Sequence, residues 1–218
     1  HGYREIVLSG VCLGSYGKDL GSEWTLSRLI REALARPGCY RLRLSSIDPR
    51  DTPVELARLM ADDPRLCPQL HLSLQSGDDR ILRLMRRGYT CADYAALTED
   101  LRRQVPHIGL TTDIIAGFPG EDESSYGRTE EFVRRIGFHR VHVFPYSERE
   151  RTAAVRLPDP VPVEVVRERT RRLESTARRT AEQALEAYVG HTVYVLVESR
   201  PGSQRSAEGF SEHYARCV

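Results

Sequence analysis

The stretch Thr111–Glu121, TTDIIAGFPGE, decides the fold class of this chain. Its residues up to Ile115 have the β-branched, apolar composition of a buried strand, and the glycines on either side of Pro119 favour a tight turn. The following segment, EDESSYGRTEEFVRRIG, places acidic residues in a first helical turn and arginines in the last, where the helix dipole favours them. The stretch therefore predicts a strand, a glycine turn and a helix.

The same unit recurs along the chain. Strand patterns occur in REIVLSG, YRLRLSS, QLHLSLQSG, GLTTDII and RVHVFPYS. Helical patterns separate them near Glu23–Arg36, Pro53–Asp62, Asp79–Met85 and Ala92–Gln104. This alternation predicts an α/β fold of βαβ units with a parallel sheet, and right-handed crossovers would curl it into a TIM-type (β/α) barrel. A complete barrel takes about 250 residues, so residues 1–150 predict a partial one.

Small and polar residues follow every predicted strand. The strand ends read Ser9-Gly10, Ser45-Ser46, Gln75-Ser76-Gly77, Gly117-Phe118-Pro119-Gly120 and Pro145-Tyr146-Ser147. Active sites of barrels lie at the carboxyl ends of the strands. Loops are rich in such residues for purely local reasons, but five such ends together favour a polar small-molecule pocket.

The composition is that of a soluble protein and excludes few partners. The chain has 218 residues and a formal net charge of +1, and no apolar run approaches membrane-spanning length. The first residues lack a secretory signal pattern, so we expect a cytoplasmic protein without membrane contact. The cysteines are odd in number and scattered, which argues against disulfides and against a zinc or iron–sulfur site. They are Cys12, Cys39, Cys67, Cys91 and Cys217. We interpret His71 and His142 as structural histidines rather than metal ligands.

Two further segments follow the predicted barrel. Residues 151–189 predict a proline-rich linker and a long amphipathic helix, whose apolar stripe is Val166, Thr170, Leu173, Ala177, Ala181, Ala184 and Tyr188. Six arginines occupy much of the remaining helix surface: Arg167, Arg169, Arg171, Arg172, Arg178 and Arg179. They could attract RNA, but interleaved glutamates favour a solvated face with ion pairs. Residues 190–218 predict two strands joined by a Gly/Ser loop.

Five blocks in order carry a specific resemblance. They are EIVLSGVCLGSYG, RLRLSSIDP, CPQLHLSLQSGDDRILRLMRRGYT, LTTDIIAGFPGE and HVFPYSERERTAA. The series resembles the radical S-adenosylmethionine (SAM) methylthiotransferases. Within them it most resembles the branch that modifies N6-threonylcarbamoyladenosine next to the anticodon of tRNA. The residues of the first two blocks resemble that branch more than they resemble the isopentenyladenosine enzymes. Residues 190–218 resemble the opening of the TRAM domain, a small β domain that holds tRNA.

The resemblance implies that the barrel strand ends bind SAM. It places Ser9 and Gly10 near the methionyl group, with Ser45 on the same rim. Polar residues after the next strand, Gln75 and Ser76, are implied near the ribose. The last two strands are implied beside the adenine, through Asp113, Gly117, Pro145 and Tyr146. A zwitterionic cofactor with a ribose and a flat base needs a few placed polar groups in a mostly apolar cleft, which these residue types supply.

One departure from the family pattern concerns the metal. The family has Cys-x-x-x-Cys-x-x-Cys after its first barrel strand, which binds a 4Fe-4S cluster, and a second cluster in an amino-terminal domain. Thiolates are the ligands that hold such clusters. This sequence has no such triplet. We therefore expect a fragment that lacks the cluster ligands and ends within the TRAM-like segment, and that is inactive by itself.

The leading hypothesis is part of an enzyme that adds a methylthio group to C2 of N6-threonylcarbamoyladenosine by radical SAM chemistry. The resemblance implies tRNA, SAM and an electron donor protein as partners. Alternatives are a cluster-less SAM- or RNA-binding remnant, an enzyme acting on N6-isopentenyladenosine, or an ordinary barrel enzyme such as an aldolase. The only lysine, Lys18, lies in a loop, which argues against Schiff-base chemistry.

Overall fold

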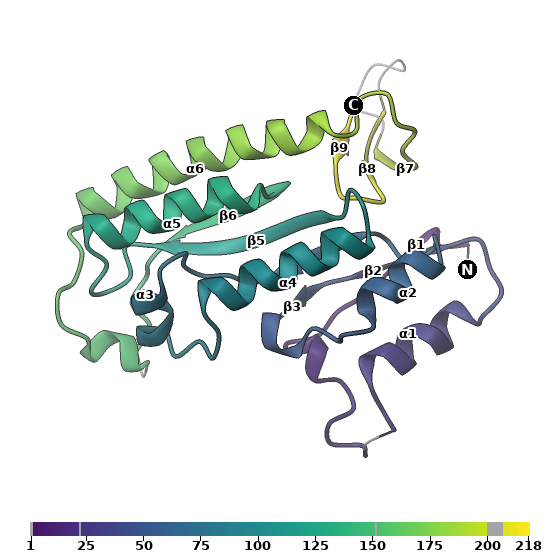
Figure 1. Cartoon of the computed structure of the whole chain (residues 1–218), viewed down its shortest axis with the longest axis horizontal. Helices are drawn as coiled ribbons and strands as arrows, with labels where there is room; N and C mark the ends of the chain where they lie inside the picture. Colours follow the sequence, from purple (N-terminus) through teal and green to yellow (C-terminus); the bar gives the residue numbers. More distant parts are fainter. Residues whose placement is uncertain (1, 22, 151, 200–206) are drawn as a thin grey trace. The chain divides into compact units, whose positions relative to one another are not determined.

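The computed structural model describes residues 2–21, 23–150, 152–199 and 207–218 (Figure 1). The chain divides into two compact units. The first unit is His1–Leu72, Glu99–Leu110 and Leu185–Val218, and the second is Ser73–Thr98 and Thr111–Ala184. Parallel strands alternate with helices in both units, so the predicted α/β class is confirmed.

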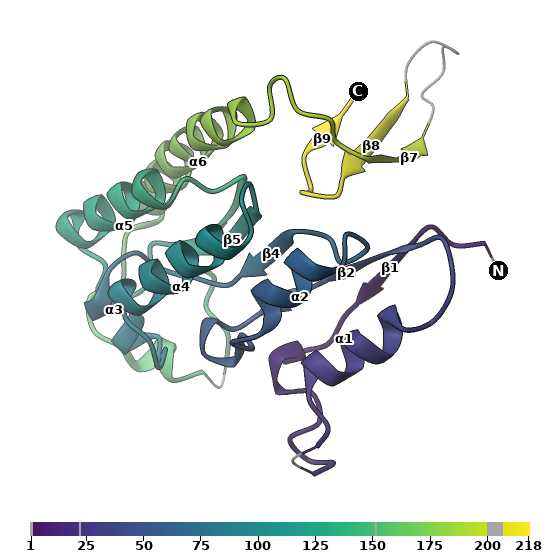
Figure 2. The same ribbon diagram turned by 45° about the vertical axis from the view of Figure 1, so that its right-hand side comes forward.

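In the first unit, two pairs of short strands run parallel. They are β1 (Glu5–Leu8) with β2 (Arg41–Leu44), and β3 (Ser46–Ile47) with β4 (Gln69–Leu72). Single helical turns follow two of these strands, η1 (Leu13–Ser15) and η2 (Pro49–Asp51). The helices α1 (Leu26–Leu34) and α2 (Leu56–Asp62) lie side by side (Figure 2). They confirm the two helices that the sequence predicts here.

Helix α1 illustrates how the sequence sets these elements. The Thr25 hydroxyl accepts a hydrogen bond from the Arg28 N–H at 3.2 Å and so caps the amino end of the helix. Leu26, Ile30 and Leu34 are buried and recur every four residues, which places them on one face. The helix therefore begins at a capping residue and is held by one apolar stripe.

The second unit contains the longest parallel pair. Strand β6 (Arg140–Pro145) pairs with β5 (Gly109–Ala116), from Thr111 opposite Arg140 to Ala116 opposite Pro145. The helices are α3 (Asp79–Leu84), α5 (Glu123–Ile136) and α6 (Val163–Glu186), with a helical turn, η3, at Ala153–Arg156. Helix α4 (Cys91–Gln104) and strand β5 have residues in both units.

Strand β4 is shorter than the sequence predicts. The alternating pattern of QLHLSLQSG continues to Gly77, but the strand ends at Leu72. Gln75 then forms a single parallel bridge with Ile114. Its backbone has a positive φ of 72°, a conformation that a continuous strand cannot contain. The extended pattern is therefore interrupted by one residue in the left-handed region.

Helix α5 confirms the helix predicted after the GFPG turn. The Asp122 carboxylate caps it by accepting from the Ser125 N–H at 2.7 Å, and Gly137 ends it in the left-handed conformation. Phe132 of α5 packs edge-on against Tyr94, with ring centroids 6.0 Å apart. Figures 1 and 2 both show α5 and α6 side by side. These contacts form the core of the second unit.

The buried seam of α6 differs from the predicted stripe. Its buried residues are Val166, Arg169, Leu173, Thr176, Ala177 and Thr180. The predicted Thr170, Ala181 and Ala184 are only half-buried. Polar residues fit the seam because they are bonded inside it: the Thr176 hydroxyl donates to the Glu130 carboxylate at 2.8 Å. Arg169, expected on a solvated face, is buried in an ion pair.

The last segment forms three antiparallel strands where the sequence predicts two. They are β7 (Val195–Ser199), β8 (Glu208–Ser211) and β9 (Arg216–Cys217). The Gly/Ser loop, residues 200–206, lies outside the described residues. Strand β9 is only two residues long, which is too short for its alternation to stand out in the sequence.

Two arginines of β2 hold this small sheet within the first unit. Arg41 donates to the Phe210 carbonyl at 2.9 Å, and Arg43 donates to the Ser211 carbonyl at 3.0 Å. Both also bind the Glu5 carboxylate. Burial would raise the pKa of Glu5, but hydrogen bonds and charges from both arginines outweigh it and lower that pKa. A carboxylate kept ionised thus holds both guanidinium groups against the sheet.

Candidate functional site

The turn after β5 is stabilised by its own glutamate. Gly117 has a positive φ of 79°, and its N–H donates to the Glu121 carboxylate at 2.9 Å. A Cβ added at Gly117 would also overlap the Val166 side chain of α6. Glycine is therefore required here both for its backbone conformation and for the close approach of the helix. This explains the first glycine of the GFPGE stretch.

A buried ion pair joins this turn to α6. The Arg169 guanidinium lies 3.0 Å from the Glu121 carboxylate, and the two side chains are 6% and 1% exposed. Arg169 also donates to the Glu121 carbonyl at 2.8 Å. Burial raises the pKa of Glu121, while the Gly117 N–H and Arg169 oppose that rise. The pair fixes the turn and the first turns of α6 as one structure.

A cavity of about 340 Å³ lies at the ends of β5 and β6. Its walls come from the two strand ends, the segment before α6 and the first turn of α6: Pro119, Pro145, Tyr146, Glu148, Pro160, Val161, Val163, Val166 and Arg167. Most of these side chains are apolar. The Phe118 ring packs edge-on against Tyr146, with centroids 5.3 Å apart. This cavity thus contains Pro145 and Tyr146, two of the predicted site residues, next to the Gly117 turn.

Tyr146 is one of three residues with polar side-chain groups that line this cavity, with Glu148 and Arg167. Its backbone N–H donates to the Ala116 carbonyl at 2.8 Å, which continues the pairing of β6 with β5. Its hydroxyl oxygen is buried and has no hydrogen-bond partner within residues 2–21, 23–150, 152–199 and 207–218. Burial raises the pKa of Tyr146, so the phenol stays protonated at neutral pH. Within the described residues, the Tyr146 hydroxyl is thus an unsatisfied buried polar group next to the cavity.

Gln75 and Asp113 are brought together through their backbones. The Gln75 N–H donates to the Asp113 carbonyl at 2.8 Å, and the Gln75 carbonyl accepts from the Ile115 N–H at 3.0 Å. Ser76 is fully buried, and its hydroxyl bonds to the Thr129 hydroxyl at 3.2 Å. The Asp78 N–H also donates to Ser76 at 3.2 Å. The Ser76 side chain therefore holds the local turn.

The other predicted site residues lie in the first unit. Ser9 and Gly10 directly follow β1 and are exposed. The Ser45 N–H donates to the Leu8 carbonyl at 2.9 Å, so Ser45 lies at the carboxyl end of the same strand pair. Its hydroxyl oxygen is buried without a hydrogen-bond partner in the part of the chain that the structure describes. The first unit thus brings Ser9, Gly10 and Ser45 to one strand end.

Sequence reasoning missed Glu121 and Arg169 as site residues. The available signal for Arg169 was its spacing, since it lies between Val166 and Leu173 on one helix face. The signal for Glu121 was its place four residues after a glycine in a tight turn. Neither pattern identifies the partner, because the two residues are far apart in the sequence.

The cysteines do not fit a 4Fe-4S cluster. Cys12 and Cys39 are exposed and Cys67 is buried, and the described residues contain no group of three possible metal ligands that includes a cysteine. Burial raises the pKa of Cys67 to about 11, and burial together with Asp79 raises that of Cys91 to about 12. Cluster ligands are thiolates, and the surroundings of these two sulfur atoms disfavour the thiolate form.

The fold is that of the radical SAM class. Residues 2–133 match the family model of the radical SAM superfamily, and the chain belongs to that superfamily. In the structure of coproporphyrinogen III oxidase from Escherichia coli, a radical SAM enzyme, the similarity covers 82% of this chain and 40% of that chain. The TM-score is 0.50 and the sequence identity is 17%, so this likeness supports the fold alone.

Similar sequences include tRNA methylthiotransferases of two kinds. A threonylcarbamoyladenosine tRNA methylthiotransferase of Thermotoga maritima is 40% identical over 99% of this chain and 49% of its own length. A tRNA-2-methylthio-N(6)-dimethylallyladenosine synthase of Acetivibrio thermocellus is 41% identical over 90% of this chain and 41% of its own length. The chain spans about half the length of the curated relatives it matches. The predicted radical SAM superfamily is confirmed, and the similarity to tRNA methylthiotransferases agrees with the predicted resemblance without separating its two branches.

None of the helices in the described residues combines the length and the apolar character needed to cross a bilayer.

Proposed function

We propose that this chain is the SAM-binding part of a tRNA methylthiotransferase that adds a methylthio group to C2 of N6-threonylcarbamoyladenosine. The observation that carries the proposal is the identity of about 40% to tRNA methylthiotransferases over nearly the whole chain. We further propose tRNA as the macromolecular substrate and the cytoplasm as the location. An electron donor protein is part of the same proposal, because radical SAM chemistry requires an electron.

The cavity of the second unit is proposed to hold the adenine of SAM. An adenine ring is flat and largely apolar, which suits walls of proline, valine and tyrosine. The buried Tyr146 hydroxyl would donate to a ring nitrogen, and Pro119 and Pro145 would exclude water from the ring. SAM, when bound, supplies the sulfonium group whose carbon–sulfur bonds are broken in the reaction.

The other predicted site residues are proposed to contact the ribose and the methionyl end of SAM, or to hold the nearby turns. Gln75 and Asp113 are proposed for the ribose, and Ser9, Gly10 and Ser45 for the methionyl end. Ser76 is proposed to act through the turn that it holds, because its hydroxyl is already bonded within the protein. Gly117 is likewise proposed to act by shaping the turn after β5, because its N–H already donates to the Glu121 carboxylate. The cluster of the family is proposed to lie on residues other than these cysteines, so the chain is expected to be inactive by itself.

The choice between the two branches rests on the residues of two short sequence blocks rather than on overall sequence identity. Relatives of the two kinds are 40% and 41% identical, which does not separate them. The blocks GVCLGSYG and RLSSIDP resemble the threonylcarbamoyladenosine branch. The isopentenyladenosine branch is therefore the second candidate, and a SAM- or RNA-binding remnant is the third.

Nucleoside analysis tests this proposal. The reading frame of this chain, with any in-frame codons on either side, would be expressed in a bacterial host that lacks its own tRNA methylthiotransferases. Mass spectrometry of the digested tRNA is expected to detect 2-methylthio-N6-threonylcarbamoyladenosine, and the 218-residue chain alone is expected to yield none. The methylthio derivative of isopentenyladenosine in its place would contradict the branch. Absence of both products from the full frame would contradict the enzyme.

A further inference from the structure

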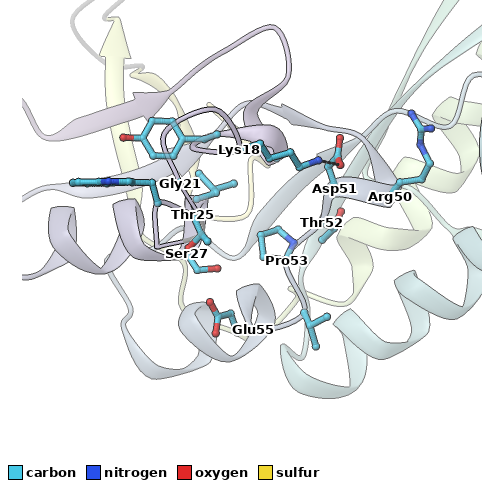
Figure 3. A pocket seen from close by; sticks show the side chains of 14 residues that line it. Lys18, Gly21, Thr25, Ser27, Arg50, Asp51, Thr52, Pro53 and Glu55 are labelled. Carbon is cyan, nitrogen blue, oxygen red and sulfur yellow. Dashed lines mark hydrogen bonds and ion pairs between the residues drawn. The ribbon is translucent and has the colours of Figure 1, made fainter.

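Two sequence blocks of the first unit meet around a second cavity. LGSYG follows β1, and SIDPRD contains β3 and η2, so both loops follow parallel strands. The Ser15 hydroxyl donates to the Asp51 carboxylate at 3.1 Å, and the Lys18 ammonium donates to the same carboxylate at 2.7 Å. Figure 3 shows Lys18 and Asp51 joined on one side of the cavity, and Glu55 on another side next to Ser27.

The cavity has the size of a small-molecule site. Its volume is about 700 Å³, within the range of roughly 300 to 1,000 Å³ that is usual for ligand pockets. Its residues come from the loops after β1 and β3 and from the start of α1. Because carboxyl ends of parallel strands carry the ligand sites of barrels, its position suits a substrate rather than a structural void.

Two aromatic side chains line this cavity. Trp24 is the only tryptophan of the chain and is 40% exposed, and Tyr16 lines the same cavity. Gly17 has a positive φ of 84°, and a Cβ added there would overlap the Trp24 carbonyl. The Arg28 guanidinium lies 4.4 Å from the centroid of the Trp24 ring. The Trp24 backbone is therefore closely packed on Gly17, and the partly exposed Trp24 ring contacts Arg28.

The charges of the cavity are paired. Lys18 binds Asp51, and Glu55 binds Arg31 of α1 at 2.9 Å. Such a lining offers little net charge to a phosphate or a free carboxylate. It does offer carboxylate oxygens as acceptors beside a flat ring. A nucleobase, which is flat and neutral and carries amino donors, matches this chemistry.

We propose that this cavity binds one unpaired nucleobase of the RNA substrate, stacked on Trp24, with Asp51 and Glu55 accepting from its N–H groups. Unpaired bases of RNA are recognised in this way, by stacking on aromatic side chains and by hydrogen bonds to base edges. The inference rests on the proposed function, which names RNA as the substrate. It adds a contact that the SAM site does not supply.

Intrinsic fluorescence tests the inference directly, since Trp24 is the only tryptophan. A single-stranded oligoribonucleotide with the anticodon-loop sequence of a tRNA that carries the modified adenosine would be titrated into the chain. The emission of Trp24 is expected to be quenched to saturation. Free adenosine serves as a second ligand, which distinguishes an RNA site from a site for a small nucleoside. Quenching by adenosine without quenching by the RNA would overturn the inference.

Variants measure what the stacking contributes. Fluorescence anisotropy of the labelled oligoribonucleotide is expected to show about tenfold weaker binding by Trp24→Leu, since base stacking contributes about 1–3 kcal/mol per base. Trp24→Phe, which keeps a stacking ring, is expected to bind nearly as tightly as the unchanged chain. Tyr3→Leu is the matched control, because Tyr3 is 76% exposed and does not line the cavity.

Equal RNA affinity of Trp24→Leu and the unchanged chain would overturn the inference, as would a chain that binds no RNA at all. SAM binding by the same preparations distinguishes failure of the nucleobase site from failure of the proposed function. If SAM still binds while Trp24 plays no part in RNA binding, only the nucleobase site is wrong. If neither SAM nor RNA binds, the proposed function fails as well.

Discussion

Replacing Arg169 with methionine is expected to lower the free energy of unfolding by about 3–5 kcal/mol at neutral pH, the usual cost of removing one partner of a buried ion pair. The substitution leaves the Glu121 carboxylate, only 1% exposed, without the guanidinium 3.0 Å away. Methionine keeps much of the volume of the arginine stem, so the loss reports the charge rather than a cavity. Urea denaturation followed by circular dichroism measures the effect.

The same variant carries a signed pH dependence. Burial already raises the pKa of Glu121 above its usual value of 4.5, and loss of Arg169 removes an opposing charge. A carboxyl group whose pKa is raised in the folded state stabilises the fold at low pH and loses that contribution as pH rises. The gap between Arg169→Met and the unchanged chain should therefore narrow as the pH falls towards 4.5, because protonation neutralises the buried carboxylate.

Arg171→Met is the matched control on the same helix. Arg171 is exposed, and its guanidinium donates to the Arg167 carbonyl one turn earlier. Its replacement is expected to change the free energy of unfolding by no more than about 0.5 kcal/mol. Equal stabilities of the two variants would show that the Glu121–Arg169 pair does not hold α6 to the turn.

Replacing Gly117 with alanine is the second large effect, a destabilisation of about 3 kcal/mol. The left-handed conformation contributes about 1–2 kcal/mol for a residue with a Cβ, and overpacking a closed site contributes about 1–3 kcal/mol. Both conditions hold, because φ is 79° and the added Cβ would overlap Val166. Thermal unfolding of the variant measures the sum.

A double-mutant cycle separates the two causes. Val166→Ala removes the methyl groups that an added Cβ would meet at Gly117. Gly117→Ala is expected to cost about 1 kcal/mol less in that background, because the closest contacts of the added Cβ are removed while the backbone strain remains. If the cost is the same in both backgrounds, the helix does not contact the turn as closely as described.

The sequence could predict the local elements of this fold well. The β-branched run before Gly117 forms β5, and the segment after the turn, with its acidic start and arginine-rich end, forms α5. These signals are local, because strand composition, helix capping and the requirement of Gly117 for glycine depend on nearby residues. The resemblance to the radical SAM superfamily is confirmed. It too rests on local signals, because each of the five ordered blocks is a run of neighbouring residues.

What the sequence could not predict depends on partners far along the chain. The interleaved glutamates of the helix predict a solvated face for Arg169, whereas the structure buries it in an ion pair with Glu121. The sequence predicts Ser76 as a ligand contact, whereas in the structure its hydroxyl is hydrogen-bonded to the Thr129 hydroxyl. The Lys18–Asp51 pair likewise joins two blocks that are separate in the sequence. Such pairings follow from tertiary structure, which periodicity does not encode.

Saturation-transfer difference NMR of SAM with the 218-residue chain tests the central claim most directly, since it detects weak binding without a cluster. The account predicts that the adenine protons receive saturation from the chain. The signal should disappear in Tyr146→Ala and persist in Tyr194→Ala, a 75% exposed tyrosine that does not line the adenine cavity. No transfer to SAM, or equal transfer in both variants, would contradict the assignment of the adenine to this cavity.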